Sequence, residues 1–251
     1  MATLSESHVD LETSRGPMRV HLFIPDGGAR YPGVIFYSEI FQVTGPIRRM
    51  AAALAGEGHL VAVPEVYHEF ELPGTVLAYD ADGSARGNAL KIEKELASYD
   101  EDADVLVKFL AIHPSCTGQI ASFGICLGGH LAVRAGLHPG ISAVAAFYPT
   151  DLHSRSLGLG KCDDTMQRLP TTRASLLLVF GRQDPHIPLQ GRRMIREIVE
   201  DADLDFEWHE FNAAHAFLRD EGPRYNPALA HVAIALLLRF LREKVGVSGR
   251  E

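Results

Sequence analysis

One hexapeptide constrains this chain more than any other segment: Gly124-Ile125-Cys126-Leu127-Gly128-Gly129, set between a strand-like run and a helical run. The pattern G-x-C-x-G between a strand and a helix is that of a nucleophile elbow, with cysteine in place of serine. The backbone of such a turn is strained, and side chains at the flanking positions would collide with the adjoining strand and helix. The motif therefore predicts Cys126 at a helix N-terminus, where free backbone N–H groups favour negative charge.

A plain tight turn is the competing interpretation of this hexapeptide, with Cys126 as a small buried core residue. The rest of the chain has to decide between the two interpretations. A thiol nucleophile needs a base, and the base needs a third group that orients it. In the order found on strand–turn–helix elbows of this kind, the acid follows the nucleophile in sequence, and the histidine comes last.

Two segments downstream of Cys126 place an acid and a histidine in loops that follow predicted strands. Residues 175–180 (SLLLVF) lead into a loop that contains Asp184, and residues 205–211 lead into a loop that contains His215. The carboxyl ends of parallel strands share one edge of the sheet, which is where ligands bind in open α/β folds. We therefore expect Cys126, Asp184 and His215 to meet as nucleophile, acid and base.

Each of these assignments has an alternative. Asp184 could stabilise a turn or cap the next helix, and His186, in the same loop, competes with His215 for the role of base. The remaining histidines are scattered without metal-ligand spacing, so no metal and no cofactor are expected. Tyr148, just after a predicted strand, could line a pocket or pack in the core.

The alternation of short apolar runs with helical stretches predicts an α/β fold, with a mostly parallel central sheet flanked by helices on both faces. We expect a single domain over residues 1–251. Predicted strands cover residues 18–24, 33–38, 60–63, 119–123, 142–147, 175–180 and 205–211, and predicted helices cover residues 46–57, 89–112, 127–137, 189–199 and a stretch from 227. Long connections are expected at 64–88, as a lid or pocket wall, and at 150–170.

Composition and charge limit the possible partners. The formal net charge of −8 argues against broad electrostatic binding to nucleic acid or anionic lipid. The three cysteines form neither a disulfide framework nor a C-x-x-C pair. The N-terminus lacks the apolar core of a signal peptide, and no apolar stretch approaches the roughly 20 residues of a membrane span, so a cytoplasmic location without membrane contact is expected.

At these motifs the chain resembles the dienelactone hydrolases, a family of α/β-hydrolases, over nearly its whole length. The elbow around Cys126, the segment 181–188 and the tripeptide His215-Ala216-Phe217 are similar to the family's nucleophile, acid and histidine segments. Ser38-Glu39-Ile40-Phe41, at the end of a predicted strand, is a fourth match. The resemblance implies a carboxylic ester or lactone hydrolase that acts on a small-molecule substrate, as a monomer or homodimer.

The resemblance also implies a mechanism. Cys126 would attack the substrate carbonyl and form a thioester, and backbone N–H groups of Ile40 and Leu127 would form the oxyanion hole. In similar enzymes the glutamate that matches Glu39 contacts the resting thiol and releases it when substrate arrives. A carboxylate beside a thiol disfavours the thiolate, so such a contact suppresses oxidation. Without the resemblance, Glu39 would be an ordinary loop acid.

Two arginines are candidates for binding a substrate carboxylate, because a guanidinium pairs with a carboxylate through two parallel hydrogen bonds. Arg219 lies four residues after the predicted base, and Arg86 lies about where the family places a second such residue. Around Arg86 the chain departs from the family pattern. If neither residue binds the carboxylate, the chain would still be an esterase, one with no preference for anionic substrates.

Two other classes of protein remain as alternatives. A non-catalytic small-molecule binder on the same fold would have no need of the complete triad. A thiol-based redox protein would need a resolving cysteine close to Cys126, and Cys116 would have to be near it in space.

Overall fold

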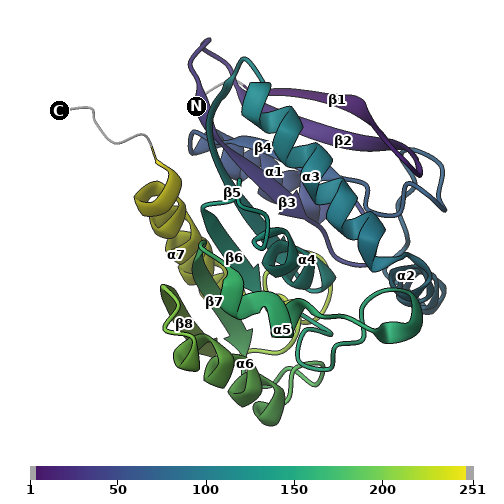
Figure 1. Cartoon of the computed structure of the whole chain (residues 1–251), viewed down its shortest axis with the longest axis vertical. Coiled ribbons are helices and arrows are strands. Elements are labelled where there is room, and N and C mark those ends of the chain that lie inside the picture. The colour runs from purple at the N-terminus through teal and green to yellow at the C-terminus, as the bar shows by residue number, and fades with distance from the viewer. Residues whose placement is uncertain (1–3, 247–251) are drawn as a thin grey trace.

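The computed structural model describes residues 4–246, and its centre is one eight-stranded sheet with helices on both faces (Figure 1). The strands follow the order β1-β2-β4-β3-β5-β6-β7-β8. Neighbouring strands from β4 to β8 run parallel, whereas β2 is antiparallel to both β1 and β4. The predicted α/β fold with a mostly parallel sheet is therefore confirmed.

The strands are β1 (Leu4–Thr13), β2 (Gly16–Pro25), β3 (Tyr31–Tyr37), β4 (Leu60–Pro64), β5 (Cys116–Ile125), β6 (Ala143–Phe147), β7 (Ser175–Gly181) and β8 (Phe206–Phe211). The α-helices are α1 (Gly45–Gly56), α2 (Ala81–Glu93), α3 (Leu96–Ile112), α4 (Leu127–Ala135), α5 (Thr165–Arg168), α6 (Leu189–Asp201) and α7 (Pro227–Val245). Every predicted strand is present, and each of its ends lies within three residues of the predicted one.

The sheet is covered by two layers of helices. In Figure 1, α3 and α4 lie in front of the sheet and α1 and α7 lie behind it. The central strands are buried on both faces, which explains why β4 (LVAVP) and β6 (AVAAF) are apolar at nearly every position instead of alternating. The apolar side chains of strands and helices form one continuous core.

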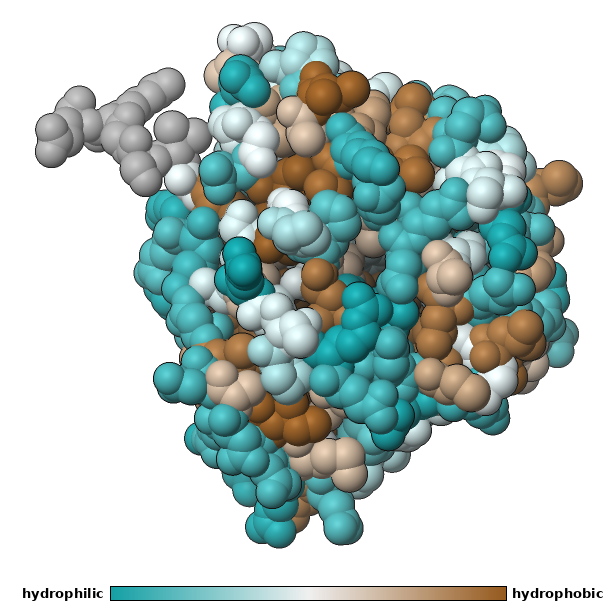
Figure 2. All heavy atoms as spheres, in the orientation of Figure 1, coloured by the Kyte–Doolittle hydropathy of each residue, from teal (hydrophilic) through white to brown (hydrophobic). Residues whose placement is uncertain are grey.

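Polar residues dominate the surface. Figure 2 shows hydrophilic side chains over most of one face, with hydrophobic ones in small separate groups. Between residues 4 and 246, no helix combines the length and the apolar composition that crossing a bilayer requires.

The prediction of one helix over residues 89–112 is wrong. The chain forms α2 and α3 instead, and the backbone between them is extended at Lys94. The side chain of Lys94 is fully buried, and its ammonium pairs with the carboxylates of Glu69, at 2.5 Å, and Asp102, at 2.9 Å. A buried ammonium is stable only with such partners, so these ion pairs fix the chain at the break.

The prediction of a long loop over residues 64–88, forming a lid or pocket wall, is partly wrong, because α2 begins at Ala81, although Ser84 and Asn88 do line the same cavity as Cys126. Asp80 caps this helix by accepting a hydrogen bond from the backbone N–H of Gly83 at 2.8 Å. Strand β1 was not predicted either. It pairs with β2 over ten residues, but its side chains are mostly exposed and polar, so its apolar alternation is weak.

The nucleophile elbow is formed as the hexapeptide predicts. Cys126 has φ 59° and ψ −124°, between the end of β5 and the start of α4. A Cβ atom at Gly124 would overlap the carbonyl oxygen of Gly128, and one at Gly128 would overlap the carbonyl oxygen of Tyr37. The two glycines are therefore required because three backbone segments approach one another at this point.

Replacing Gly124 by alanine tests this packing. We expect Gly124→Ala to lower the free energy of unfolding by more than about 3 kcal/mol, because the added methyl group meets backbone that cannot move aside. Gly56→Ala is the matched control, since Gly56 is helical and a Cβ there would have open space around it. The control should change stability by less than about 1 kcal/mol. Urea unfolding measures both, and equal stabilities would contradict the account.

Candidate active site

Three loops at the carboxyl edge of the sheet bring the predicted triad together. Cys126 follows β5, Asp184 follows β7 and His215 follows β8. The Nδ1 atom of His215 lies 2.6 Å from Oδ2 of Asp184, and His215 and Cys126 line the same cavity. All three residues are at least nine-tenths buried. The arrangement can move a proton from the thiol to a histidine that a carboxylate holds in place.

The proton affinity of His215 reflects its two neighbours. Burial lowers its pKa, but electrostatic interaction with Cys126 and the hydrogen bond with Asp184 outweigh burial and raise the pKa to about 10. Asp184 occupies Nδ1, so Nε2 is the nitrogen left for the thiol.

Asp184 also stabilises the turn that contains it, which was the alternative role considered in the sequence analysis. Its second oxygen, Oδ1, accepts a hydrogen bond from the backbone N–H of His186 at 2.8 Å and so stabilises the turn. The carboxylate is thus shared between the loop and His215, and it is His215, not His186, whose ring it contacts. Tyr148 is fully buried in the core, and its ring packs against His215 with 5.1 Å between ring centroids.

The two backbone N–H groups predicted to form an oxyanion hole belong to Leu127 and Ile40. Leu127 is the first residue of α4, so its N–H has no acceptor within the helix. The N–H of Ile40 donates to no acceptor in the described part of the chain. Helix α2 packs closely against this loop, since a Cβ at Gly87 would overlap the carbonyl oxygen of Ile40.

The catalytic cavity, as we call the space in front of Cys126, has a volume of about 300 Å³. Two ion pairs form part of its wall: Lys91 with Asp151 at 2.8 Å, and Arg219 with Glu39 at 3.7 Å. Arg224 also lines the cavity, and no carboxylate within residues 4–246 pairs with it. The other lining residues are Ile40, Phe41, Ser84, Asn88, Cys126, Thr150, His153, Ser154, His186 and His215.

Glu39 lines this cavity and is almost fully buried. Burial raises the pKa of its carboxyl group, and Arg219 and a hydrogen bond from Tyr79 oppose that rise. The hydroxyl of Tyr79 donates to Oε2 of Glu39 at 3.1 Å, and the Arg219 guanidinium stacks over the Tyr79 ring at 4.2 Å. Within the described residues, no hydrogen bond joins Glu39 to Cys126, so the expected contact with the thiol stays a prediction.

The structure does not bring Arg86 to the catalytic cavity. Arg86 lies on α2, with its side chain on the outside, and its Nε donates to Glu71 at 2.7 Å. The sequence missed Lys91, Asp151 and Arg224 as cavity residues. The start of α2 at Ala81 was not predicted from the sequence. Lys91 and Arg86 both lie on this helix, and the helix turns Lys91 toward the cavity and Arg86 away from it.

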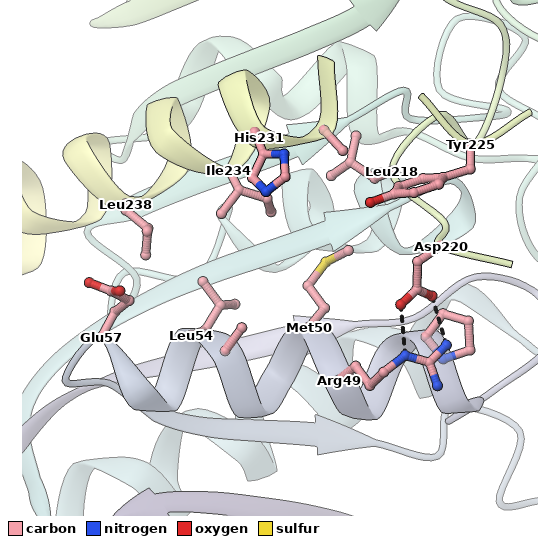
Figure 3. Close-up of a pocket in the computed structure, with 13 residues that line it drawn as sticks. Arg49, Met50, Leu54, Glu57, Leu218, Asp220, Tyr225, His231, Ile234 and Leu238 are labelled. Atoms are coloured by element: carbon pink, nitrogen blue, oxygen red, sulfur yellow. Dashed lines mark hydrogen bonds and ion pairs between the residues drawn. The ribbon is translucent and has the colours of Figure 1, made fainter. Parts of the chain in front are cut away.

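A second cavity, of about 320 Å³, lies between α1 and α7 (Figure 3). Its wall is mostly apolar, with Leu54 and Ile234 among its residues. Figure 3 shows Asp220 pointing toward Arg49 of α1, and the two side chains make paired hydrogen bonds of 2.7 Å. The loop after β8 thus directs Asp220 to this outer cavity, while Arg224 of the same loop lines the catalytic cavity.

No group of three or more His, Cys, Asp or Glu side chains in residues 4–246 is arranged to hold a metal ion.

Comparison with known proteins gives a consistent result. The model of the dienelactone hydrolase family matches residues 18–245. A Saccharomyces cerevisiae protein named "Putative carboxymethylenebutenolidase" is 40% identical, with 97% of this chain and 93% of that protein covered. A carboxymethylenebutenolidase of Pseudomonas sp. is 26% identical, with 94% of each chain covered. The crystal structure named "Putative Dienelactone Hydrolase" from Klebsiella pneumoniae superimposes with a TM-score of 0.83 at 22% identity, covering 96% of this chain and 99% of that one.

The pH dependence of His215 tests the electrostatics of the triad. Its pKa is raised above the value of about 6.5 in the unfolded chain. The stability it contributes is therefore complete below about pH 6.5 and is lost as the pH rises through about 10. Asp184→Asn removes the charge that faces Nδ1, so His215 should titrate at a lower pH and stability should fall less over this window. NMR titration of the imidazole and urea unfolding from pH 6 to 10 measure both effects. Identical titrations of wild type and variant would contradict the assignment.

Proposed function

The chain belongs to the dienelactone hydrolase family, and from this membership and the catalytic cavity we propose that it hydrolyses a small lactone or ester that carries a carboxylate. It is a carboxymethylenebutenolidase-like hydrolase. Our proposal concerns the catalytic roles of Cys126, Asp184 and His215 and the negative charge of the substrate. The single observation that carries the proposal is the hydrogen bond between Asp184 and His215, whose ring lines the same cavity as Cys126.

In the first half of the proposed reaction, His215 takes the proton of the thiol and the sulfur of Cys126 attacks the substrate carbonyl. The N–H groups of Ile40 and Leu127 stabilise the negative charge that develops on the carbonyl oxygen. The tetrahedral intermediate collapses to a thioester, and the leaving oxygen receives the proton from His215.

In the second half, His215 activates a water molecule that hydrolyses the thioester and frees the thiol. Asp184 keeps the imidazole in the tautomer and orientation that both halves need. Burial of the triad favours this chemistry, because electrostatic interactions are stronger where water is excluded.

The charges of the catalytic cavity support an anionic substrate. Lys91 and Arg219 each have a carboxylate partner, whereas Arg224 adds a positive charge with none among the described residues. We propose that Arg219 binds the substrate carboxylate, and that Glu39 holds its guanidinium in place until substrate arrives. Arg86 is not part of this proposal, because Glu71 engages it outside the cavity.

A redox role has little support from the positions of the cysteines. Cys116 is the first residue of β5, and Cys126 directly follows the last, so a strand of about 3.3 Å per residue separates them. Cys162 is exposed and lies in a different loop, and all three thiols are free. The alternative of a non-catalytic binder is tested by the hydrolysis assay that follows, in which a binder would show no turnover.

Hydrolysis of a neutral chromogenic acetate and of a carboxylate-bearing dienelactone tests the proposal with four proteins. Wild type should hydrolyse both substrates, and Cys126→Ala should hydrolyse neither. Arg219→Ala should raise KM for the dienelactone by about tenfold or more, since a charged hydrogen bond is lost, and should alter KM for the acetate far less. Arg86→Ala is the matched control and should behave as wild type.

Three outcomes would contradict the proposal. If wild type and Cys126→Ala are equally inactive, the chain is a binder. If Cys126→Ala retains full activity, the nucleophile is another residue. If Arg219→Ala affects both substrates equally, the chain is an esterase without preference for a carboxylate.

A further inference from the structure

We infer that His186 is a further catalytic residue, whose imidazole donates a hydrogen bond to the leaving-group oxygen of the substrate. The inference rests on the proposed function and assigns a role to a histidine that the triad does not use. It follows from the position of His186, from the contact of its ring with His215, and from its two ring nitrogens, which have no hydrogen-bond partner within residues 4–246.

His186 is fixed beside the triad by both its backbone and its ring. Its N–H donates to Oδ1 of Asp184, the carboxylate that also holds His215. Its ring meets the ring of His215 edge-on, with 4.6 Å between centroids and 69° between planes. The two imidazoles are therefore neighbours on one wall of the catalytic cavity.

The ring nitrogens of His186 are available to a substrate. Neither nitrogen has a hydrogen-bond partner within residues 4–246, although the ring lines the cavity. His186 is an exposed residue, and partial desolvation of its ring, together with the neighbouring His215, lowers its pKa. At neutral pH the ring is therefore uncharged, with one N–H donor and one acceptor nitrogen.

The proposed reaction would bring the leaving oxygen to the side of the cavity on which this ring lies. Asp184 occupies Nδ1 of His215, so the proton for the leaving group comes from Nε2. The oxyanion hole binds the carbonyl oxygen through Ile40 and Leu127, and the leaving oxygen therefore lies on the side of His215. A ring that touches His215 and faces the cavity borders that position.

The step is balanced without any further reactant. The bond between the sulfur and the carbonyl carbon forms, the bond between that carbon and the leaving oxygen breaks, and the electron pair stays on the oxygen. His215 gives this oxygen its proton, and His186 keeps its own proton while its N–H stabilises the developing charge. In a lactone the leaving oxygen remains tethered to the acyl chain, so it stays within reach of His186 during deacylation.

His153 provides a matched control. It also lines the catalytic cavity and its pKa is also lowered by burial, but its ring packs close to Gly191 of α6. In the described chain its ring has no stacking contact with His215. A change at His153 therefore alters the cavity wall without removing a ring that contacts His215.

The test compares kcat/KM for a series of aryl acetates whose leaving phenols span a range of pKa values up to about 10. His186→Phe keeps an aromatic ring against His215 but removes the donor, and His186→Asn keeps a donor without the ring. For His186→Phe we expect about a tenfold loss with the poorest leaving group and almost none with the best, because a poor leaving group needs the hydrogen bond most. His186→Asn should recover part of this loss. His153→Phe should leave the slope of log(kcat/KM) against leaving-group pKa unchanged.

An unchanged slope in His186→Phe would overturn the inference, as would a loss that is the same for every leaving group. A loss in His186→Asn together with full activity in His186→Phe would show that only ring packing matters, and would overturn it too. These results leave the proposed function intact, provided that Cys126→Ala is inactive. Failure of the wild type to hydrolyse any ester would overturn both proposals.

Discussion

The close approach of three backbone segments at the elbow is the constraint on which the rest of the site depends. Gly124 and Gly128 leave no room for side chains, so β5, α4 and the end of β3 meet at backbone distance. This contact places Cys126 in a left-handed conformation at the start of α4. Glu39 and Ile40, in the loop after β3, line the same cavity as Cys126. One packing contact therefore sets the positions of Cys126, of the loop with Glu39 and Ile40, and of the start of α4 relative to one another.

Around this contact, the catalytic cavity balances its charges in pairs. Asp184 faces His215, Asp151 faces Lys91 and Glu39 faces Arg219. Buried charges are costly without such partners, which explains why each cation inside the cavity has a carboxylate within 4 Å. The exposed Arg224 needs no partner for its stability, and it is free to interact with an anion that enters.

The sequence was sufficient to predict the fold class and the proximity of Cys126, Asp184 and His215, because the first follows from apolar runs and the second from residues at strand ends. It was insufficient where contacts between residues distant in sequence determine where a helix begins or ends. The break at Lys94 depends on buried ion pairs with Glu69 and Asp102, which lie apart from it in sequence. Because this break and the start of α2 were missed, the sequence could not indicate that Arg86 faces outward. Strand β1 is mostly exposed and is held by backbone pairing with β2 more than by burial. Its sequence therefore lacks the clear apolar alternation from which a strand can be predicted.

The central claim is that the Cys126 sulfur carries the acyl group during the reaction. Rapid acid quenching during turnover of a slowly hydrolysed ester, followed by peptide mass spectrometry, measures this directly. The account predicts the mass of the acyl group on the peptide that contains Cys126, and release of that group by hydroxylamine, as expected for a thioester. Acylation of a different residue, or turnover at full rate with no acylated enzyme at any quench time, would contradict it.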